Sequence, residues 1–452
     1  MKKFNQLFIL PLLAFTLFAC QPAVKPTSTT SRIPEWSKNS VLYEVNIRQY
    51  TPEGTFKAFE THLPRLKELG VDILWIMPIH PISMVKRKGG LGSYYSVKDY
   101  KGINPEFGTM QDFKDLVNKA HELGFKVIID WVANHTGWDN QWIFDHPEWY
   151  TKDSLGNIIP PNPDWADIAD LNFDSKPMRR AMIDAMDFWI KEADIDGFRC
   201  DAAWGAPQDF WEQARASIDS LKPVYLLAED EDHPDFLKNA FASNYSWKLH
   251  HILNEVAKGK ETAQDIKTYL AESVNKYAPG SFQMQFITNH DENSYQGSEF
   301  ERMGDAVKSI ATLTFTIEGI PLIYSGQEAG LHKRLLFFEK DTINWTNLAM
   351  QEFYQKLTTL KHQNPALWNG TAGGKLNIVE TTNPDKVLAF TREKENNSIF
   401  AVFNLSAEPV ETTVQLAQAG DYQEYFSGES KKLEKGSTMK LDKWGYQIFI
   451  KK

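Results

Sequence analysis

The sequence repeats one structural unit, in which an amphipathic helix ends at a glycine and an apolar strand follows almost at once. In the clearest copy, the segment 63–69 places its three leucines on one helical face, Gly70 is positioned to end the helix, and the apolar run 71–77 follows. A second copy predicts a helix over 109–123 and a strand over 125–132. Alternating helices and near-continuous apolar strands indicate a parallel sheet whose faces are covered by helices.

Eight apolar segments fit the strand part of this unit: 41–47, 71–77, 125–132, the segment around Phe198, 224–228, a weaker one at 243–249, 282–288 and 320–325. Eight such strands predict a closed (β/α)8 TIM barrel, and a doubly wound open sheet is the alternative. The barrel is favoured because the polar residues considered below follow the C-terminal ends of strands, where barrel enzymes build their sites.

Two stretches break the repeating unit and predict further domains. Residues from about 136 to 170 lack helical or strand periodicity but are rich in tryptophan and tyrosine, so we expect a small domain inserted after the third strand. After about residue 365 the pattern changes to short alternating runs separated by Gly, Asn and Ser, which is typical of an all-β domain. We therefore expect a catalytic barrel over 37–365 and a C-terminal β-sandwich over 366–452.

The N-terminus has the features of an export signal. After a short basic start, residues 7–19 are apolar, a run too short for a mature membrane-spanning helix. The string Leu17-Phe-Ala-Cys20 resembles the lipobox of bacterial lipoproteins, so we expect a signal peptide over 1–20 and lipidation of Cys20. A flexible tether over 21–36 would follow. This predicts an exported protein held at a bacterial membrane, periplasmic or at the cell surface, by its lipid anchor alone; the alternative is an ordinary signal peptide with a chance cysteine.

Net charge and cysteine content exclude several classes of protein. The formal net charge of −10 argues against nucleic acid as a partner, because nucleic-acid-binding surfaces are basic, and favours a neutral polymer or oligomer. Only two cysteines occur, Cys20 and Cys200, so the fold is not built on disulfides. Cys200 lies in an apolar strand and is interpreted as a packed small hydrophobic residue.

Three strings place carboxylates at the ends of three predicted strands: Gly197-Phe-Arg-Cys-Asp201, Leu226-Leu-Ala-Glu229 and Phe286-Ile-Thr-Asn-His-Asp291. Cleavage of a glycosidic bond needs one ionised carboxylate and one protonated acid flanking the anomeric carbon, and a separation of about 5 Å indicates retention of configuration. Residues two apart in a strand point the same way, so Arg199 and Asp201 should both face the barrel axis. We expect the Arg199 cation to keep the pKa of Asp201 low.

These strings, together with Asp130-Trp-Val-Ala-Asn134-His135, resemble the ordered motifs of the α-amylase superfamily, glycoside hydrolase family 13. The resemblance covers nearly the whole mature chain. It implies that Asp201 is the nucleophile, Glu229 the general acid/base and Asp291 the stabiliser of the transition state.

The same resemblance implies a set of substrate-binding residues: Tyr95, with Tyr94 as a rival, Asp130, His135, Arg199 and His290. Four tryptophans are further candidates for stacking against sugars, although core packing is as good an explanation for each: Trp138, Trp142, Trp149 and Trp204.

One departure from the family pattern bears on substrate and metal. Endo-acting α-amylases usually continue the nucleophile motif with Lys-His, which serves the leaving-group side and helps to bind calcium, whereas Asp201 is followed here by Ala202-Ala203-Trp204-Gly205. This argues against the usual calcium, although Asn134 retains the position of a calcium ligand in the family. The chemistry itself needs no cofactor.

The sequence thus predicts a retaining α-glucan hydrolase that cleaves α-1,4 bonds in maltooligosaccharides or starch by double displacement. A transglycosylase or isomerase would use the same three acids, and an α-1,6-acting enzyme similar to oligo-1,6-glucosidase or neopullulanase is also open. A glycan-binding lipoprotein without activity is a further alternative, but such proteins usually lose one of the three acids. Endo or exo action and oligomeric state stay open.

Overall fold

A computed structural model describes Met1 and residues 32–452 of the chain. The predicted lipidation site Cys20 and the predicted tether as far as residue 31 lie outside the described residues. From Arg32 the chain packs on the barrel: the Arg32 guanidinium donates to the carbonyl of Pro279 at 3.1 Å, and Trp36 packs against the apolar residues inside the barrel. Residues 32–36, which we expected to belong to the tether, are therefore part of the folded domain. Among the described residues, no helix has the length and apolarity needed to cross a membrane.

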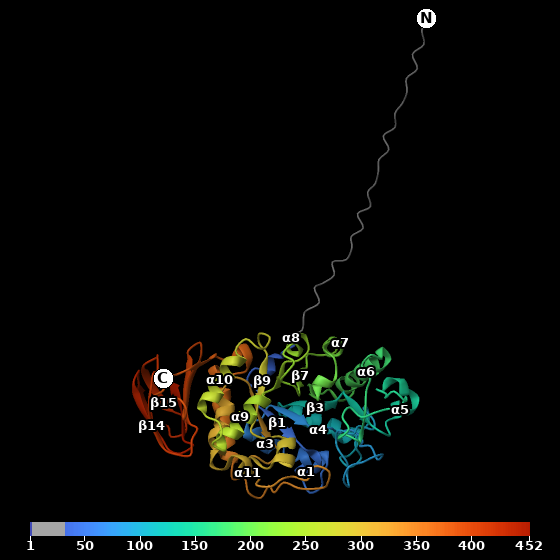
Figure 1. Cartoon of the computed structure of the whole chain (residues 1–452), viewed down its shortest axis with the longest axis horizontal. Helices are drawn as coiled ribbons and strands as arrows, with labels where there is room; N and C mark the ends of the chain where they lie inside the picture. Colours follow the sequence, from blue (N-terminus) through green and yellow to red (C-terminus); the bar gives the residue numbers. More distant parts are fainter. Residues whose placement is uncertain (2–31) are drawn as a thin grey trace. The chain divides into compact units, whose positions relative to one another are not determined.

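Eight parallel strands close into a barrel in the order β1-β10-β9-β8-β7-β6-β3-β2, which confirms the predicted TIM barrel. Each lies within or at the edge of a segment predicted as a strand. Their bounds are β1 Leu42–Val45, β2 Ile73–Ile76, β3 Lys126–Val132, β6 Gly197–Asp201, β7 Tyr225–Ala228, β8 Ser243–Tyr245, β9 Phe282–Gln285 and β10 Ile320–Tyr324. In Figure 1 these strands lie in the middle of the domain, with helices around them.

Helices connect successive strands and cover the barrel. Their bounds are α1 Ile47–Tyr50, α2 Phe56–Glu60, α3 Leu63–Leu69, α4 Met110–Glu122, α6 Lys176–Ala193, α7 Gln208–Asp219, α8 Phe236–Asn239, α9 Trp247–Ala257, α10 Ala263–Ser273, α11 Glu299–Met303, α12 Val307–Thr316 and α13 Gln351–Gln363. The expected end signals are present. Thr109 and Asp112 form a reciprocal capping box at the start of α4, and Gly70 ends α3 with a left-handed φ of 86°.

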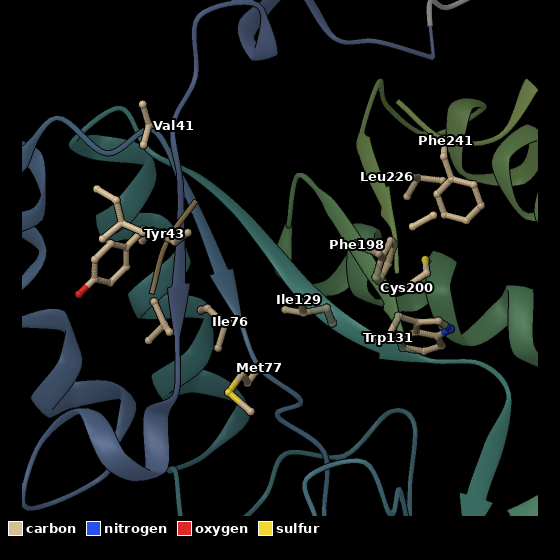
Figure 2. Packing of buried hydrophobic residues seen from close by; sticks show 14 of the residues in the cluster. Val41, Tyr43, Ile76, Met77, Ile129, Trp131, Phe198, Cys200, Leu226 and Phe241 are labelled. Atoms are coloured by element: carbon tan, nitrogen blue, oxygen red, sulfur yellow. The ribbon is translucent and has the colours of Figure 1, made fainter. Parts of the chain in front are cut away.

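The barrel strands have two different faces. Side chains that point outward pack under the helices, as Figure 2 shows for Ile129, Trp131, Phe198 and Cys200. Cys200 is fully buried in this layer and unpaired, as expected for a packed small hydrophobic residue. Inward-pointing residues form a separate apolar cluster that fills the barrel interior. The polar side chains at the C-terminal ends of the strands lie at the end of the barrel, next to this apolar cluster.

The aromatic-rich excursion after β3 is closed by a short antiparallel pair, β4 His135–Gly137 with β5 Ile168–Asp170. Between them lie the helix α5 Gln141–Asp145 and loops. Trp142 and Trp149 pack edge to face at 5.3 Å. Trp142 also packs on Tyr100 at 5.1 Å, which attaches the excursion to the segment between β2 and α4.

The end of the chain forms the predicted all-β domain, drawn in orange to red in Figure 1. A six-stranded sheet, in the order β11-β12-β13-β18-β15-β16, faces the two-stranded sheet β14-β17 across a common apolar core. The strand bounds are β11 Leu376–Ile378, β12 Val387–Lys394, β13 Asn397–Asn404, β14 Val410–Val414, β15 Gly420–Glu424, β16 Ser430–Leu433, β17 Ser437–Leu441 and β18 Tyr446–Lys451.

Candidate active site

A cavity of about 1260 Å³ opens at the C-terminal ends of the barrel strands. Asp201 is the last residue of β6, Glu229 directly follows β7, and Asp291 lies in the segment after β9. All three carboxylates line the cavity, so the topology brings together residues that are 90 positions apart in the sequence (from 201 to 291).

Arg199 joins the two central carboxylates. It lies two residues before Asp201 on β6 and is fully buried. One terminal nitrogen of its guanidinium lies 3.0 Å from Asp201 Oδ1 and 2.9 Å from Asp130 Oδ1, and the other lies 2.8 Å from Glu229 Oε1. The remaining Glu229 oxygen accepts a hydrogen bond from the backbone N–H of Ala202 at 2.8 Å. Both oxygens of Glu229 therefore face nitrogen donors, which favour its ionised form and oppose the effect of burial.

The two central acids have raised pKa values. Burial and the neighbouring Glu229 carboxylate raise the pKa of Asp201 well above its ordinary value, although Arg199 acts in the opposite direction. Burial also raises the pKa of Glu229, more than Arg199 lowers it. The expectation that Arg199 keeps the pKa of Asp201 low is therefore wrong for the free site. The physical reason is that burial and the neighbouring carboxylate together raise the pKa of Asp201 more than one cation lowers it.

His290 is held between two carboxylates. Its Nδ1 lies 2.5 Å from Glu44 Oε1, and its Nε2 lies 3.4 Å from Asp291 Oδ2. Burial lowers the pKa of His290, but Asp291 and Glu44 outweigh burial and raise this pKa to about 9. As an imidazolium, His290 donates through Nε2 to the hydroxyl of Tyr95 at 2.8 Å, and Tyr95 donates in turn to Asp130 at 3.0 Å. A hydrogen-bonded chain thus connects Glu44 with Arg199 and the two central acids.

Aromatic rings surround the acids. Tyr95 lies nearly parallel to Phe337, with ring centroids 6.3 Å apart, and Phe337 also lines the cavity. The ring centroids of Trp165 in the excursion and Trp204 in the turn after β6 lie 6.4 Å apart, with the rings tilted by 46°, and Trp204 is 52 % exposed. Apolar ring faces beside carboxylates suit a ligand with both C–H faces and hydroxyl groups, which a sugar has.

Comparison with known proteins identifies this architecture. The family model described as the alpha amylase catalytic domain matches residues 28–156 and 162–408 of the chain. The chain belongs to the alpha-amylase family. A second family model, the C-terminal domain of maltogenic amylase, matches residues 376–448, within the all-β domain.

Individual alpha-amylase family members agree with this assignment. Alpha-amylase MalA of Haloarcula japonica is 30% identical over 413 residues, covering 88% of this chain but only 59% of MalA. The chain therefore spans less than two thirds of that relative. Among solved structures, a noncanonic maltogenic alpha-amylase AmyB from Thermotoga neapolitana superposes with a TM-score of 0.85 at 29% identity, covering 92% of this chain and 99% of that one. An alpha-amylase from Lactobacillus plantarum gives a TM-score of 0.81 at 31% identity, with the same coverage of both chains. The catalytic domain is thus that of a glycoside hydrolase.

The sequence left a calcium ion at Asn134 possible, but the surroundings of this side chain do not fit one in this alpha-amylase family member. Asn134 Oδ1 faces the backbone of Gly205, where a Cβ atom would lie only 2.0 Å away, and the Asn134 amide nitrogen lies 3.3 Å from His135 Nδ1. No group of three or more His, Cys, Asp or Glu side chains with metal-binding geometry occurs in residues 32–452. Asn134 therefore packs the turn after the nucleophile motif, and we derive no step through a metal.

The structure divides the expected substrate-binding residues into two layers. Tyr95, His135 and His290 line the cavity, whereas Asp130 and Arg199 are fully buried behind its wall. We expected these two residues to contact the sugar directly. In the structure they instead support the side chains that line the cavity, through the bonds that they make to them. The rival of Tyr95 also lies elsewhere, since the Tyr94 ring is buried beneath the Arg48 guanidinium.

Of the four candidate tryptophans, only Trp204 lines the cavity; the indole N–H of Trp138 donates to the carbonyl of Ala166 instead. Several residues of the site were not predicted: Glu44, Trp165, Trp247, Tyr295, Phe337 and Phe338. Glu44 could have been found from the sequence, because a glutamate within an apolar strand is buried and needs a polar partner. The segment around Phe337 has no periodicity and gave no signal.

Proposed function

We propose that this alpha-amylase family member hydrolyses α-1,4 bonds in maltooligosaccharides or starch and retains the configuration at the anomeric carbon. The observation that carries the proposal is the single guanidinium of Arg199, which lies behind the cavity wall and contacts both Asp201 and Glu229. This pairing supports two carboxyl groups close enough for covalent catalysis. The names of the relatives, amylases and a cyclomaltodextrinase among them, support an α-glucan as substrate.

In the first step, the Asp201 carboxylate attacks the anomeric carbon while Glu229 gives its proton to the oxygen of the leaving sugar. Asp291 and Asp201 carry the negative charge that stabilises the oxocarbenium-like transition state. For Glu229 to hold this proton on Oε1, that oxygen must release Arg199, which keeps its contacts with Asp201 and Asp130. The positive charge that develops on the sugar stabilises the ionised form of Asp201, and it therefore favours the arrangement in which the proton lies on Glu229.

In the second step, Glu229 takes a proton from a water molecule, and the resulting hydroxide oxygen bonds the anomeric carbon as the bond to Asp201 breaks. The carboxylate of Asp201 is regenerated and Glu229 is again protonated. Two inversions at one carbon leave the product in the α configuration. A sugar hydroxyl in place of water would give transglycosylation, so product analysis separates the two outcomes.

The test is product analysis by ¹H NMR with maltoheptaose, starch, pullulan and isomaltose. We expect the α-anomer to appear first from the α-1,4 substrates, and Asp201→Asn to lower kcat by about 10³-fold or more while the melting temperature is kept. A β-anomer released first, or appreciable turnover by the folded Asp201→Asn variant, would contradict the proposal. Preferential cleavage of isomaltose would assign the α-1,6 specificity instead.

We further propose that the protein is exported and anchored through lipidated Cys20. The support is the sequence of the N-terminal segment alone. Metabolic labelling with radioactive palmitate should mark the wild-type protein and leave Cys20→Ser unlabelled. Equal labelling of both would rule out Cys20 as the anchor.

A further inference from the structure

A single turn of π-helix, Glu292–Gln296, directly follows Asp291 between β9 and α11. Its hydrogen bond spans five residues, from the N–H of Gly297 to the carbonyl of Glu292 at 3.0 Å, and such turns are frequent at functional sites. Within residues 32–452, the one ion pair of the Asp291 carboxylate is that with His290, whose 3.4 Å exceeds an ordinary hydrogen bond. The position of this carboxylate therefore depends mainly on the backbone of the turn.

The Glu292 side chain ties this turn to two helices. Its Oε2 lies 3.0 Å from Nε2 of His250 on α9 and 3.6 Å from a guanidinium nitrogen of Arg302 on α11. The His250 ring is buried and stacks on Phe286, with ring centroids 4.5 Å apart. Burial raises the pKa of Glu292, but His250 and Arg302 outweigh burial and lower it. Glu292 therefore holds the turn as an ionised carboxylate.

Arg302 bonds the chain on both sides of Asp291. Before it, the guanidinium donates to the carbonyl of Ile287, just after β9, at 2.7 Å. After it, Nε of Arg302 donates to the carbonyl of Gly297, which directly follows the π-helix, at 2.9 Å. A further bond of 2.7 Å to Oδ1 of Asn254 fixes the guanidinium on α9. One cation thus fixes both ends of the segment that carries Asp291.

Two buried asparagines hold the backbone of the turn. Oδ1 of Asn289 accepts from the N–H of Glu292 at 2.8 Å, and the carbonyl of Asn289 accepts from the N–H of Asn293 at 3.0 Å. Oδ1 of Asn293 accepts in turn from the N–H of Leu335 at 2.8 Å. The asparagines thus hold the start of the turn, while Glu292 and Arg302 hold it against α9 and α11.

We propose that Glu292 is a positioning residue, which together with Arg302 and His250 holds the Asp291 carboxylate where positive charge develops on the sugar. This inference rests on the proposed function, in which Asp291 stabilises the transition state. All three side chains lie outside the cavity lining, so they act on the reaction through Asp291 and not by touching the substrate. A carboxylate that is oriented before the reaction stabilises developing charge most strongly. Loss of the Glu292 charge therefore weakens transition-state stabilisation more than substrate binding.

The test is a double-mutant cycle of Glu292→Gln, Asp291→Asn and the variant with both changes, assayed on maltoheptaose by the release of reducing ends. Glu292→Gln keeps the size of the side chain and removes its charge. Alone, it should lower kcat by about 10- to 100-fold and change KM by less than about 3-fold. In the Asp291→Asn background it should lower kcat by less than about 2-fold, because the carboxylate through which it acts is absent.

Glu352→Gln is the matched control, because Glu352 on α13 is also paired with a cation, Lys356 at 2.9 Å, but lies outside the cavity lining. It should leave kcat and KM unchanged in both backgrounds. Arg302→Lys is a second probe that replaces Glu292→Gln if that variant does not fold. It keeps the charge but loses the planar fork that reaches the carbonyls on both sides of Asp291, so we expect the same pattern of losses.

The outcomes separate this inference from the proposed function. An equal effect of Glu292→Gln or Arg302→Lys with and without Asp291→Asn, including no effect in either background, overturns the positioning role. A rise in KM as large as the fall in kcat also overturns it, since a general weakening of the site would produce that result. A wild-type protein that does not cleave maltoheptaose, or a fully active Asp291→Asn variant, contradicts the proposed function instead.

Discussion

At the scale of single residues, Asp291 and Glu44 together raise the pKa of His290. One carboxylate oxygen of Glu44 bonds His290, and the other has no hydrogen-bond partner within the part of the chain that the structure describes. Besides Glu44, the titratable groups that act on His290 are Asp291, Tyr95 and Arg199. Because Asp291 is partly exposed and Glu44 is fully buried, we expect Glu44 to be the partner less screened by water.

Glu44→Gln keeps the size of the side chain and removes its charge. The pKa of His290 should then fall from about 9 toward the ordinary value of about 6.5. A folded-state pKa above the unfolded one stabilises the fold fully below pH ~6.5, and this stabilisation is lost as the pH rises through about 9. Glu44→Gln should flatten this loss of stability at alkaline pH.

The measurement is a pH titration of the histidine ring signals by two-dimensional NMR, with His290→Gln to assign the signal and thermal melts from pH 6 to 10. Glu299→Gln is the control, since Glu299 is also a buried glutamate but does not contact His290. An unchanged His290 titration in Glu44→Gln would show that Glu44 serves only to fill space.

At the scale of elements, the backbone of β7 lies against Gly197 of β6 and leaves no room for a side chain there. This residue has φ of 152°, and a Cβ atom there would lie 1.8 Å from the carbonyl oxygen of Tyr225 on β7. The two strands carry Asp201 and Glu229 at their ends, so their spacing determines the spacing of the acids.

Gly197→Ala should reduce the free energy of unfolding by about 3 kcal/mol or more, because the strand must shift to relieve the overlap. Urea unfolding followed by circular dichroism measures this loss. The matched control is Gly259→Ala, which has φ of 71° but no atom within 4 Å of the added carbon, and should lose only about 1 kcal/mol. Equal losses in the two variants would mean that the overlap with β7 has no effect.

The elements that sequence reasoning found are those with a repeating physical signal. The barrel strands appear as apolar runs because they are buried on both faces, and the start of α4 is visible because Thr109 and Asp112 bond each other's backbone. Trp165 and Phe337 reach the site from irregular segments, where position depends on long-range packing. The pKa of Asp201 also depends on burial, which motif spacing does not report.

At the scale of the whole molecule, Arg392 of β12 joins the all-β domain to the barrel. It is buried, and burial lowers its pKa to about 10, although the charge of Glu318 acts in the opposite direction. Its guanidinium donates to five backbone carbonyls, those of Thr316, Ile317, Leu367, Trp368 and Gly374, at 2.8 to 3.3 Å. Thr316 is the last residue of α12, where the negative end of the helix dipole favours a cation.

Arg392→Met should fit the same space but leave these carbonyls without donors, so we expect a loss of about 3 kcal/mol or more and separate melting of the two domains. Differential scanning calorimetry measures both effects. Arg180→Met, which removes only an exposed ion pair with Asp184, should change stability by less than about 0.5 kcal/mol. A single unshifted transition for Arg392→Met would contradict this role.

The central claim is that Asp201 forms a covalent bond to the sugar. Incubation with a fluorinated α-maltosyl fluoride that forms the glycosyl-enzyme but releases it slowly, followed by proteolysis and mass spectrometry, tests it most directly. The account predicts one added fluoromaltosyl group on the peptide that contains Asp201, absent from Asp201→Asn. A label on another residue, or fluoride release with an inverted product and no label, would contradict it.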